Sequence, residues 1–414
     1  MFPQVMWDVE LGANQDYLEL VVAAQITGKP KMGIAARTGA TGRGLCYATL
    51  SAVSNLYLDG KWESSVKLTK KEEILLKEIV GINVPLILEK GGIHIITEEN
   101  WNILTESIYP KLLKDKKMVV QGSGKVGSSI IKELAVYGVN LIAISDAGGA
   151  IIGDKLDPNE VLDAVAASRD LEDRSLRASV IHTEKNVTEK IKGAAEGSSI
   201  LEIECDLLFP AALEGAVTEK NAPKINTKIE ICGSNGSNSS KAEKILMEKG
   251  VLVVYDFLAN SAGVSASYFE WLRNLYQRAR YEAEVIYQKE FDDRVMDRYI
   301  MPEFKERIKD VLNQDESDEV TLQWNTILRD IMFSAVNEDY HYAREQGVSM
   351  KDAGFLNSQL RVLAAGLCRL SDAEADSMIS TLPGETQELL RKEFLSHPEV
   401  TIIQNSREMK KKLI

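Results

Sequence analysis

Between residues 116 and 146, apolar and polar positions follow a strand–helix–strand pattern. A short apolar run at Met118–Val120 predicts a buried strand, and apolar residues then recur at helical spacing over residues 126–136. A second apolar run, Leu141–Ile144, ends at a polar pair. The pattern predicts a βαβ unit, which places two parallel strands side by side in one sheet.

The turn inside this unit is rich in glycine and has the sequence Gly122-Ser123-Gly124-Lys125-Val126-Gly127. In dinucleotide-binding units such glycines form a tight turn, admit a pyrophosphate and let the helix pack on the strand. Asp146 lies 24 residues after Gly122, close to the place of the acid that binds a ribose. Two alternatives stay open: an ordinary αβ unit with a glycine-rich turn, and an Asp146 that caps the turn before Gly148.

The same alternation continues to residue 256 and predicts an α/β fold, a Rossmann-type doubly wound, mostly parallel sheet with helices on both faces. Later strands are expected at Ala178–His182, Leu207–Pro210, Ile229–Cys232 and Val251–Tyr255. Helices between them are expected at Asn159–Ser168 and Ser240–Lys249.

Before this region the pattern is less regular. We expect a helix at Asn14–Ala24, a glycine-rich loop at Gly33–Gly44 and a helix at Leu45–Leu58. Thr69 and Glu72 have capping-box spacing, which predicts a helix start. Short strands are expected at Pro85–Leu88 and Ile93–Ile96.

After Phe257 the pattern is helical, with long helices expected at Asn260–Gln288 and Leu322–Glu345. Changes in the pattern near residues 60, 115, 271, 325 and 370 divide the chain into six regions.

Composition narrows the class of protein. The 62 acidic and 49 basic residues give a net charge of −13, and no basic stripe is visible, which argues against nucleic-acid binding. The four cysteines are scattered and the four histidines lack ligand spacing, so we expect reduced thiols and no metal site. No apolar run approaches membrane-spanning length and no secretory signal is visible, which predicts an intracellular protein, cytoplasmic or mitochondrial.

With these motifs in place, the chain resembles the glutamate dehydrogenase family (the glutamate/leucine/phenylalanine/valine dehydrogenases), most closely the glutamate enzymes. The resemblance covers roughly residues 10–60 and 116–275, with a weaker match over Ala335–Leu367. It implies that the six regions are a substrate-domain remnant with a hinge helix (1–60), an insertion (61–115), a dinucleotide-binding domain (116–271), a helical insertion (272–325), closing helices (326–370) and a helical tail (371–414). The matching stretches, in the family's order, are Thr27–Pro30, Ala40–Gly44, Val119–Gly127, Ser145–Gly149, Cys205–Ala212, Asn221–Lys224, Gly233–Gly236 and Asp256–Trp271.

The resemblance implies an NAD(P)-dependent oxidative deamination of L-glutamate to 2-oxoglutarate and ammonia, which is reversible. The cofactor-binding residues it implies are Thr41, Gly122, Ser123, Gly124, Lys125, Val126, Gly127, Asp146, Ala211, Asn235 and Asn260. Ser267 is implied to contact the substrate, and Arg43 to lie near the cleft. Thr41 could instead cap the following helix, Asn235 could serve a turn, and Ser267 could be an ordinary helix serine.

The family's substrate lysines and catalytic acid lie in a domain that ends before Thr27–Pro30, and here 26 residues precede Thr27. We therefore expect that domain to be largely missing, leave the catalytic residues unassigned and expect impaired catalysis. Asp8 fits the family's acid poorly, and the Lys90-Gly91-Gly92 sequence lies on the wrong side of Gly44 to be its lysine motif.

Other positions depart from the family's usual residues. Lys125 stands where the family has asparagine, and it opposes the helix dipole but could touch a phosphate. Cys232, Ser234 and Ser237 replace Glu, Ala and Pro around Asn235. These changes could narrow the cofactor cleft, so they bear on affinity and specificity rather than on the fold.

Asp146 favours NAD over NADP, because a carboxylate repels a 2′-phosphate.

Assembly as a homo-oligomer, or as a hetero-oligomer with a full-length subunit, is open. The alternative function is that of a non-catalytic dinucleotide-binding paralogue or regulatory subunit. The insertion at residues 272–325 is similar in location to the helical antenna of some family members.

Overall fold

A computed structural model describes residues 34–80, 95–167, 180–282, 308, 311, 317–367, 372–381, 384 and 387. The chain divides into two compact units, one of residues 1–40 and 262–328 and the other of residues 41–261 and 329–414. The predictions for residues 14–24 and 85–88, and the residues Asp8, Thr27–Pro30 and Lys90, lie outside the described part.

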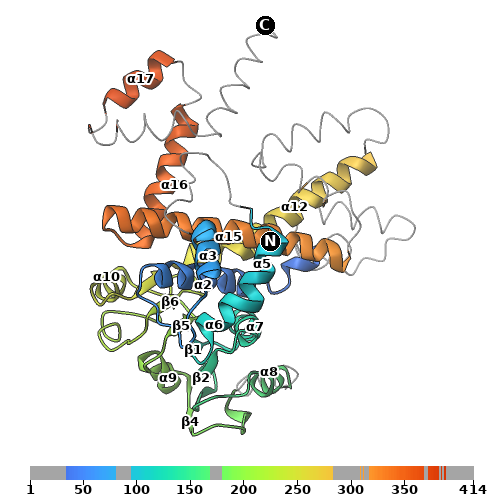
Figure 1. The fold of residues 1–414 in the computed structure, drawn as a ribbon, viewed down its shortest axis with the longest axis vertical. Helices are drawn as coiled ribbons and strands as arrows, with labels where there is room; N and C mark the ends of the chain where they lie inside the picture. The colour runs from blue at the N-terminus through green and yellow to red at the C-terminus, as the bar shows by residue number, and fades with distance from the viewer. Residues whose placement is uncertain are drawn as a thin grey trace, which may run out of the picture. The chain divides into compact units, whose positions relative to one another are not determined.

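The larger unit is built around one sheet, whose described strands have the order β4-β3-β2-β1-β5-β6-β7 (Figure 1). The pairs β1–β2, β1–β5, β5–β6 and β6–β7 are parallel, whereas β2–β3 and β3–β4 are antiparallel. The strands are β1 (Lys117–Gln121), β2 (Asn140–Asp146), β3 (Gly149–Ile152), β4 (Glu189–Lys192), β5 (Leu207–Pro210), β6 (Ile229–Ile231) and β7 (Leu252–Val254). The expected Rossmann-type, mostly parallel sheet is therefore confirmed.

Strand β1 marks the point where the strand order reverses. The chain leaves β1 for β2 on one side and later returns at β5 on the other, so that Gln121 is paired with both Ser145 and Pro210. Ligands of open α/β sheets bind outside the carboxyl ends of the strands at such a switch point. The topology therefore directs attention to the residues that follow β1, β2 and β5.

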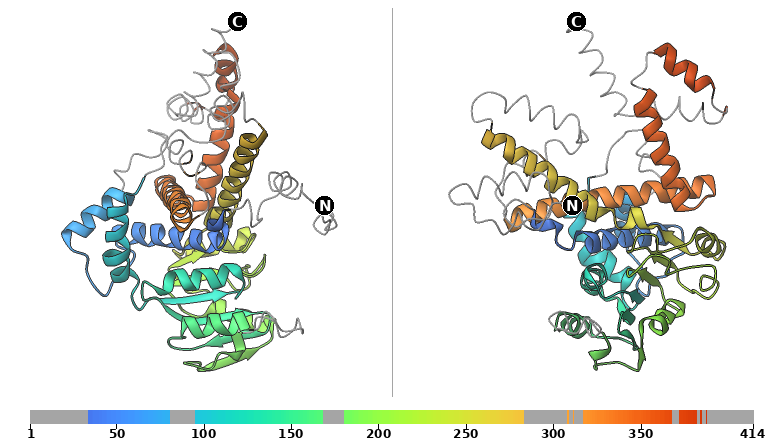
Figure 2. Two further views of the ribbon diagram at one scale, coloured as in Figure 1. Left: turned by 90° about the vertical axis from the view of Figure 1, so that its right-hand side faces the viewer. Right: turned by 180° about the vertical axis from the view of Figure 1, so that it is seen from behind.

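Within the larger unit, helices lie beside the sheet (Figures 1 and 2). The α-helices are α2 (Ala40–Leu58), α3 (Lys70–Val80), α5 (Glu98–Ile103), α6 (Tyr109–Leu113), α7 (Lys125–Ala135), α8 (Pro158–Ala167), α9 (Ala194–Gly197), α10 (Ser240–Glu248), α11 (Asp256–Ala259), α12 (Ser261–Glu282), α15 (Asp318–Gln346), α16 (Met350–Leu367) and α17 (Asp372–Ser380). The 3₁₀ segments are η3 (Ala35–Arg37), η6 (Val180–His182) and η7 (Ser198–Glu202), and η4 (Leu104–Ile108) is a π-helical turn.

Alternate side chains of β1 point to opposite faces of the sheet. Val119 belongs to a buried cluster that includes Leu208 of β5 and Leu246 of α10. Val120 faces α7, because a Cβ on Gly127 would lie 3.3 Å from its Cγ1 atom. Both faces are therefore covered, as a continuous apolar strand requires.

The helices after the sheet pack closely on it. The Tyr255 hydroxyl, next to the end of β7, donates to the Asp339 carboxylate of α15 at 2.5 Å, and the Asn357 amide of α16 donates to the same carboxylate at 2.9 Å. A Cβ on Gly354 would lie 1.9 Å from the Tyr255 hydroxyl oxygen. The glycine therefore lets α16 approach this buried polar cluster.

Several local predictions are confirmed. Thr69 and Glu72 form the expected capping box, with the Thr69 N–H donating to Glu72 at 2.7 Å and the Glu72 N–H donating to the Thr69 hydroxyl at 3.3 Å. The helices predicted at 159–168 and 240–249 are α8 and α10 within one residue at each end. Strong periodicity and caps locate these elements well.

Three expectations are wrong. The strand expected at Ala178–His182 is the 3₁₀ turn η6 where it is described. The loop expected at Gly33–Gly44 contains η3, and α2 already begins at Ala40. Residues 95 and 96, expected in a strand, lie in no strand, and the antiparallel strands β3 and β4 were not expected at all.

Glu230, in the middle of β6, is a buried acid that makes stability depend on pH. Its side chain is fully buried and accepts one hydrogen bond from the Asn238 amide at 2.7 Å. Burial raises the pKa of Glu230 to about 7, which is partly opposed by this bond. A carboxyl with a raised folded-state pKa stabilises the fold below pH 4.5, and this stabilisation is lost as the pH rises towards 7.

We expect Glu230→Gln to remove this pH dependence. At pH 8 the variant should be more stable than wild type by up to about 3 kcal/mol, and the difference should shrink towards zero at pH 5. Urea unfolding at both pH values measures it. A variant that is less stable than wild type at pH 8 would contradict the assignment.

Candidate functional site

Two of the three glycines after β1 are required by the backbone itself. Gly122 has φ +106°, and its N–H donates to the Ser145 carbonyl at 2.8 Å. A Cβ at Gly122 would lie 2.6 Å from the carbonyl oxygen of Ala211, and a Cβ at Gly127 would lie 1.8 Å from the carbonyl oxygen of Gly122. These glycines make the turn and the close helix–strand approach that the sequence pattern predicts.

Gly124 is different, because a Cβ there would meet nothing within 4 Å. It is the N-cap of α7 and has φ −66°, a value that any residue can adopt. The protein therefore does not itself require a glycine at this position. The bare backbone leaves open space where the pattern places a pyrophosphate.

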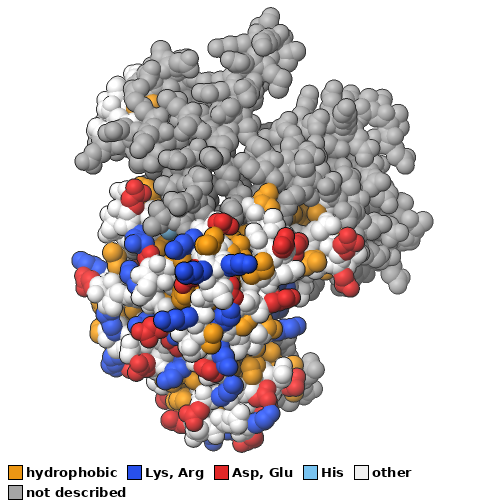
Figure 3. Space-filling model, in the orientation of Figure 1, with side chains coloured by type: hydrophobic (Ala, Val, Ile, Leu, Met, Phe, Trp, Pro, Cys, Tyr) orange, Lys and Arg blue, Asp and Glu red, His pale blue; other side chains and the backbone are white. Residues whose placement is uncertain are grey.

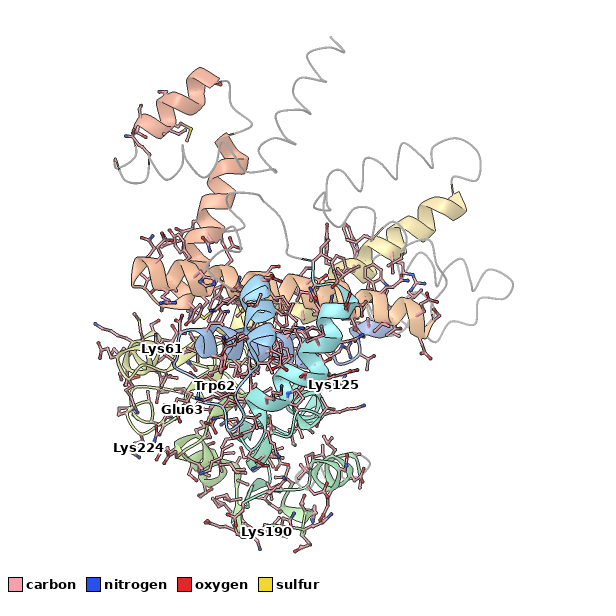
Figure 4. The ribbon with its side chains drawn as sticks, in the orientation of Figure 1. Lys61, Trp62, Glu63, Lys125, Lys190 and Lys224 are labelled. Carbon is pink, nitrogen blue, oxygen red and sulfur yellow. The ribbon has the colours of Figure 1, made fainter. Side chains whose placement is uncertain are left out.

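The first turn of α7 presents donors next to this space. The Ser128 N–H is bonded to the Gly124 carbonyl at 2.9 Å, and no side chain caps the helix. The N–H groups of residues 125–127 come before Ser128, the first N–H that donates within the helix, and with the helix dipole they form an anion-binding end. Lys125 is exposed at the first helical position, labelled in Figure 4, and Val126 after it is half-buried.

Asp146 ends β2, and protein donors bind both of its carboxylate oxygens. Oδ1 accepts from the Gly148 N–H at 2.8 Å, and Oδ2 accepts from the Val180 N–H at 2.7 Å and from the Ser123 hydroxyl at 3.2 Å. Burial raises the pKa of Asp146 above its ordinary value, and these hydrogen bonds oppose the rise. The bond from Gly148 caps the turn after β2, which is the alternative role considered for Asp146. Its contact with a ribose stays a prediction.

The start of α2 reaches this edge of the sheet. A Cβ on Gly42 would lie 2.2 Å from the Cβ of Ser129, so α2 crosses α7 in close contact. Thr41, half-buried, lies inside the first turn of α2 and is not its cap, contrary to the capping alternative. The charge of Arg43 acts on Glu133 of α7, lowering its pKa against the larger effect of burial.

Three predicted residues follow β5, β6 and β7. The Ala211 N–H donates to the Gln121 carbonyl at 2.8 Å, which places Ala211 beside the glycine turn. The Asn260 amide donates to the Asn235 amide oxygen at 2.7 Å. The structure therefore brings together the two asparagines that the resemblance assigns to the cofactor cleft.

Ser267 lies in α12, within the smaller unit. Its hydroxyl donates to the Gly263 carbonyl at 3.1 Å, one helical turn earlier. This is the arrangement of an ordinary helix serine, the alternative raised by the sequence. Its contact with a substrate stays a prediction.

Sequence reasoning missed four residues that shape the site. Val180 supplies a donor to Asp146, Ser128 holds the Ser123 carbonyl at 2.7 Å, and Gly42 permits the α2–α7 crossing. Asp256 accepts from the Gly236 N–H at 2.6 Å. Asp256 could have been found, because it follows β7 as Asp146 follows β2. The Val180–Asp146 and Gly42–Ser129 contacts join segments far apart in the chain, and the Ser128–Ser123 bond depends on the conformation of the turn.

These features define a Rossmann-type dinucleotide-binding domain: glycines at the switch point, open space at a helix N-terminus and an acid at the end of the next strand. The residues present fit a nicotinamide dinucleotide, because the open position at Gly124 leaves room where its pyrophosphate is expected. Among the described residues, no group of His, Cys, Asp or Glu could hold a metal ion.

The model of the Glutamate/Leucine/Phenylalanine/Valine dehydrogenase family matches residues 92–368. This match covers more than half of the chain, and the chain belongs to that family.

Curated relatives of the chain are named glutamate dehydrogenases. The chain is 34% identical over 198 residues to an NADP-specific glutamate dehydrogenase of Saccharolobus shibatae, which covers 48% of this chain and 42% of the relative. It is 35% identical over 163 residues to an NAD-specific glutamate dehydrogenase of Staphylococcus aureus, and this match covers 39% of this chain and 36% of the relative. The chain thus matches less than half the length of these relatives.

Among solved structures, the chain is similar to a hetero-hexameric glutamate dehydrogenase from Thermus thermophilus in its leucine-bound form. The identity is 19%, the TM-score is 0.46, and the match covers 83% of this chain and 60% of the other.

The described helices include none that is both long and apolar enough to cross a membrane. On the face shown in Figure 3, basic and acidic side chains of the described residues are interspersed. The described cysteines, Cys46, Cys205 and Cys232, are buried and form no disulfide bond.

The two kinds of glycine in the turn should respond differently to an added methyl group. Gly127→Ala should cost about 3 kcal/mol or more, because its Cβ would collide with the Gly122 carbonyl. Gly124→Ala should change stability by less than about 1 kcal/mol. Urea unfolding of both variants checks this, and equal losses would contradict the described turn.

Proposed function

We propose that this chain binds a nicotinamide dinucleotide across the carboxyl ends of β1, β2 and β5, as the cofactor domain of a glutamate dehydrogenase-like oxidoreductase. The open position at Gly124, between two glycines that the fold requires, carries the proposal. No side chain caps α7 at Gly124, so the first N–H groups of the helix are open to a ligand phosphate at this position.

We further propose NAD rather than NADP. The Asp146 carboxylate lies at the end of β2, where an adenosine ribose is expected, and a 2′-phosphate there would meet a like charge. The relatives include both NADP-specific and NAD-specific enzymes, so the choice depends on this residue in this chain.

The nicotinamide end is assigned to Thr41, Asn235 and Asn260. Their amide and hydroxyl groups are suited to orienting a carboxamide, and Asn235 and Asn260 already hold one another at 2.7 Å. When bound, the nicotinamide supplies hydride transfer at the substrate carbon. The three side chains can contribute by holding the plane of the nicotinamide ring in a fixed orientation relative to the substrate.

The proposed reaction is the reversible oxidative deamination of L-glutamate to 2-oxoglutarate and ammonia, with Ser267 contacting the substrate. No catalytic residue is assigned. Assembly with further copies or with a full-length subunit is part of the same proposal.

Binding is tested by titrating the full chain with NADH and following its fluorescence, with NADPH as the comparator. We expect saturable NADH binding that weakens about tenfold or more in Gly124→Val, because the added side chain fills the pyrophosphate space.

The matched control is Ala194→Val, which places the same valine side chain at the exposed first residue of α9. It should bind NADH like wild type, and circular dichroism should show all three proteins folded. Wild-type binding that survives Gly124→Val would show that the cradle is not the site.

Turnover is a separate measurement. We expect NADH oxidation by the chain to require both 2-oxoglutarate and ammonium and to be lost in Gly124→Val. NADH binding without any such turnover would favour the alternative of a non-catalytic dinucleotide-binding paralogue.

A further inference from the structure

The Asp146 carboxylate is already surrounded by donors that the protein supplies. The N–H groups of Gly148 and Val180 bind one oxygen each, and the Ser123 hydroxyl binds the second oxygen at 3.2 Å. The Gly149 N–H also lowers the pKa of this carboxyl. A carboxylate offers about four acceptor positions, so little capacity remains for a further donor.

Among the described donors, Ser123 is the one that can move away. The others are backbone N–H groups fixed by the β2–β3 turn and by η6, whereas the hydroxyl turns about a single side-chain bond. The Ser123 side chain is buried, with the residue only 4% exposed, and its hydroxyl joins the glycine turn directly to the acid at the end of β2.

We propose that Ser123 is a specificity-determining residue whose hydroxyl occupies the position on Asp146 that the adenosine ribose 2′-hydroxyl takes in the bound dinucleotide. This inference rests on the proposed function. Binding then exchanges one hydroxyl donor for another at the same carboxylate, and the internal bond competes with the ribose.

The competition acts on NADH and not on NADPH. A dinucleotide with a free 2′-hydroxyl has to displace Ser123 to reach Asp146. NADPH carries a phosphate in place of the 2′-hydroxyl and cannot donate from that position. Removing the Ser123 hydroxyl therefore does not raise the affinity for NADPH. Ser123 therefore sets the ratio of the two affinities.

Ser123→Ala removes the competitor without disturbing the backbone of the turn. The Ser128 hydroxyl donates to the Ser123 carbonyl at 2.7 Å, and that bond does not involve the Ser123 side chain. The matched control is Ser128→Ala, which removes the hydroxyl that donates to the Ser123 carbonyl but keeps the hydroxyl that donates to Asp146.

The test is fluorescence titration of the full-length wild type, Ser123→Ala and Ser128→Ala with NADH and with NADPH. We expect Ser123→Ala to bind NADH roughly tenfold more tightly, the value of one hydrogen bond to a charged group, with NADPH affinity unchanged. Ser128→Ala should not raise the ratio of NADH to NADPH affinity. Melting curves establish that each variant is folded.

The outcomes separate this inference from the function on which it rests. NADH affinity that is unchanged or weaker in Ser123→Ala overturns the inference while leaving the dinucleotide site in place. An equal gain for NADH and NADPH also overturns it, since that is a general loosening of the loop. Binding of NADH by Ser123→Ala but not by wild type supports it, and binding by neither overturns both proposals.

Discussion

The turn between β1 and α7 packs tightly against backbone atoms, both its own and those of Ala211. The Gly122 carbonyl oxygen lies where a side chain on Gly127 would begin, and Gly122 itself lies against the Ala211 carbonyl. No residue with a Cβ fits at either place without moving β1, β5 or α7. The position of the helix N-terminus relative to the sheet edge therefore follows from these contacts, and the open space at Gly124 exists because the backbone on both sides of it is fixed.

With the turn fixed in this way, the strand register and the helix packing determine which other residues lie near it. The parallel register of β1 with β2 and β5 brings Asp146 and Ala211 to the same edge as the turn. Close packing at Gly42 then brings the start of α2 over the start of α7. Segments separated by up to about half of the chain thus meet around one helix end, which is what a ligand as long as a dinucleotide requires.

Much of this could be predicted from the sequence, because glycine spacing and strand–helix alternation are local signals. The turn at Gly122–Gly127, Asp146 and the parallel strands were found in this way. The antiparallel strand β4 (Glu189–Lys192) was missed because three of its four residues are charged, and no apolar alternation marks it. The apolar run at Val180 resembles a strand, but it packs as the turn η6 whose N–H binds Asp146. This bond joins residues 34 positions apart, so no local sequence signal reveals it.

The internal pairs at the site could not be predicted at all. Neither the bond between Asn235 and Asn260 nor the bond between Ser123 and Asp146 leaves a trace in local spacing, since each joins residues more than twenty positions apart. They show instead how polar groups of the proposed site are satisfied within the protein. A buried donor or acceptor without a partner is costly, so a polar cleft is expected to form such pairs.

The same rule explains how the chain accommodates its unusual residues after β6. The Ser234 hydroxyl donates to the Leu213 carbonyl at 3.0 Å, and the buried Ser237 hydroxyl donates to the Ser234 carbonyl at 2.7 Å. Both hydroxyls are thus bonded within the loops that follow β5 and β6. A serine in place of alanine or proline adds a polar atom to a packed region, and here each added atom has a partner within the protein. The loop therefore keeps the geometry that presents Asn235, and the departures from the family's usual residues are compatible with an intact cleft.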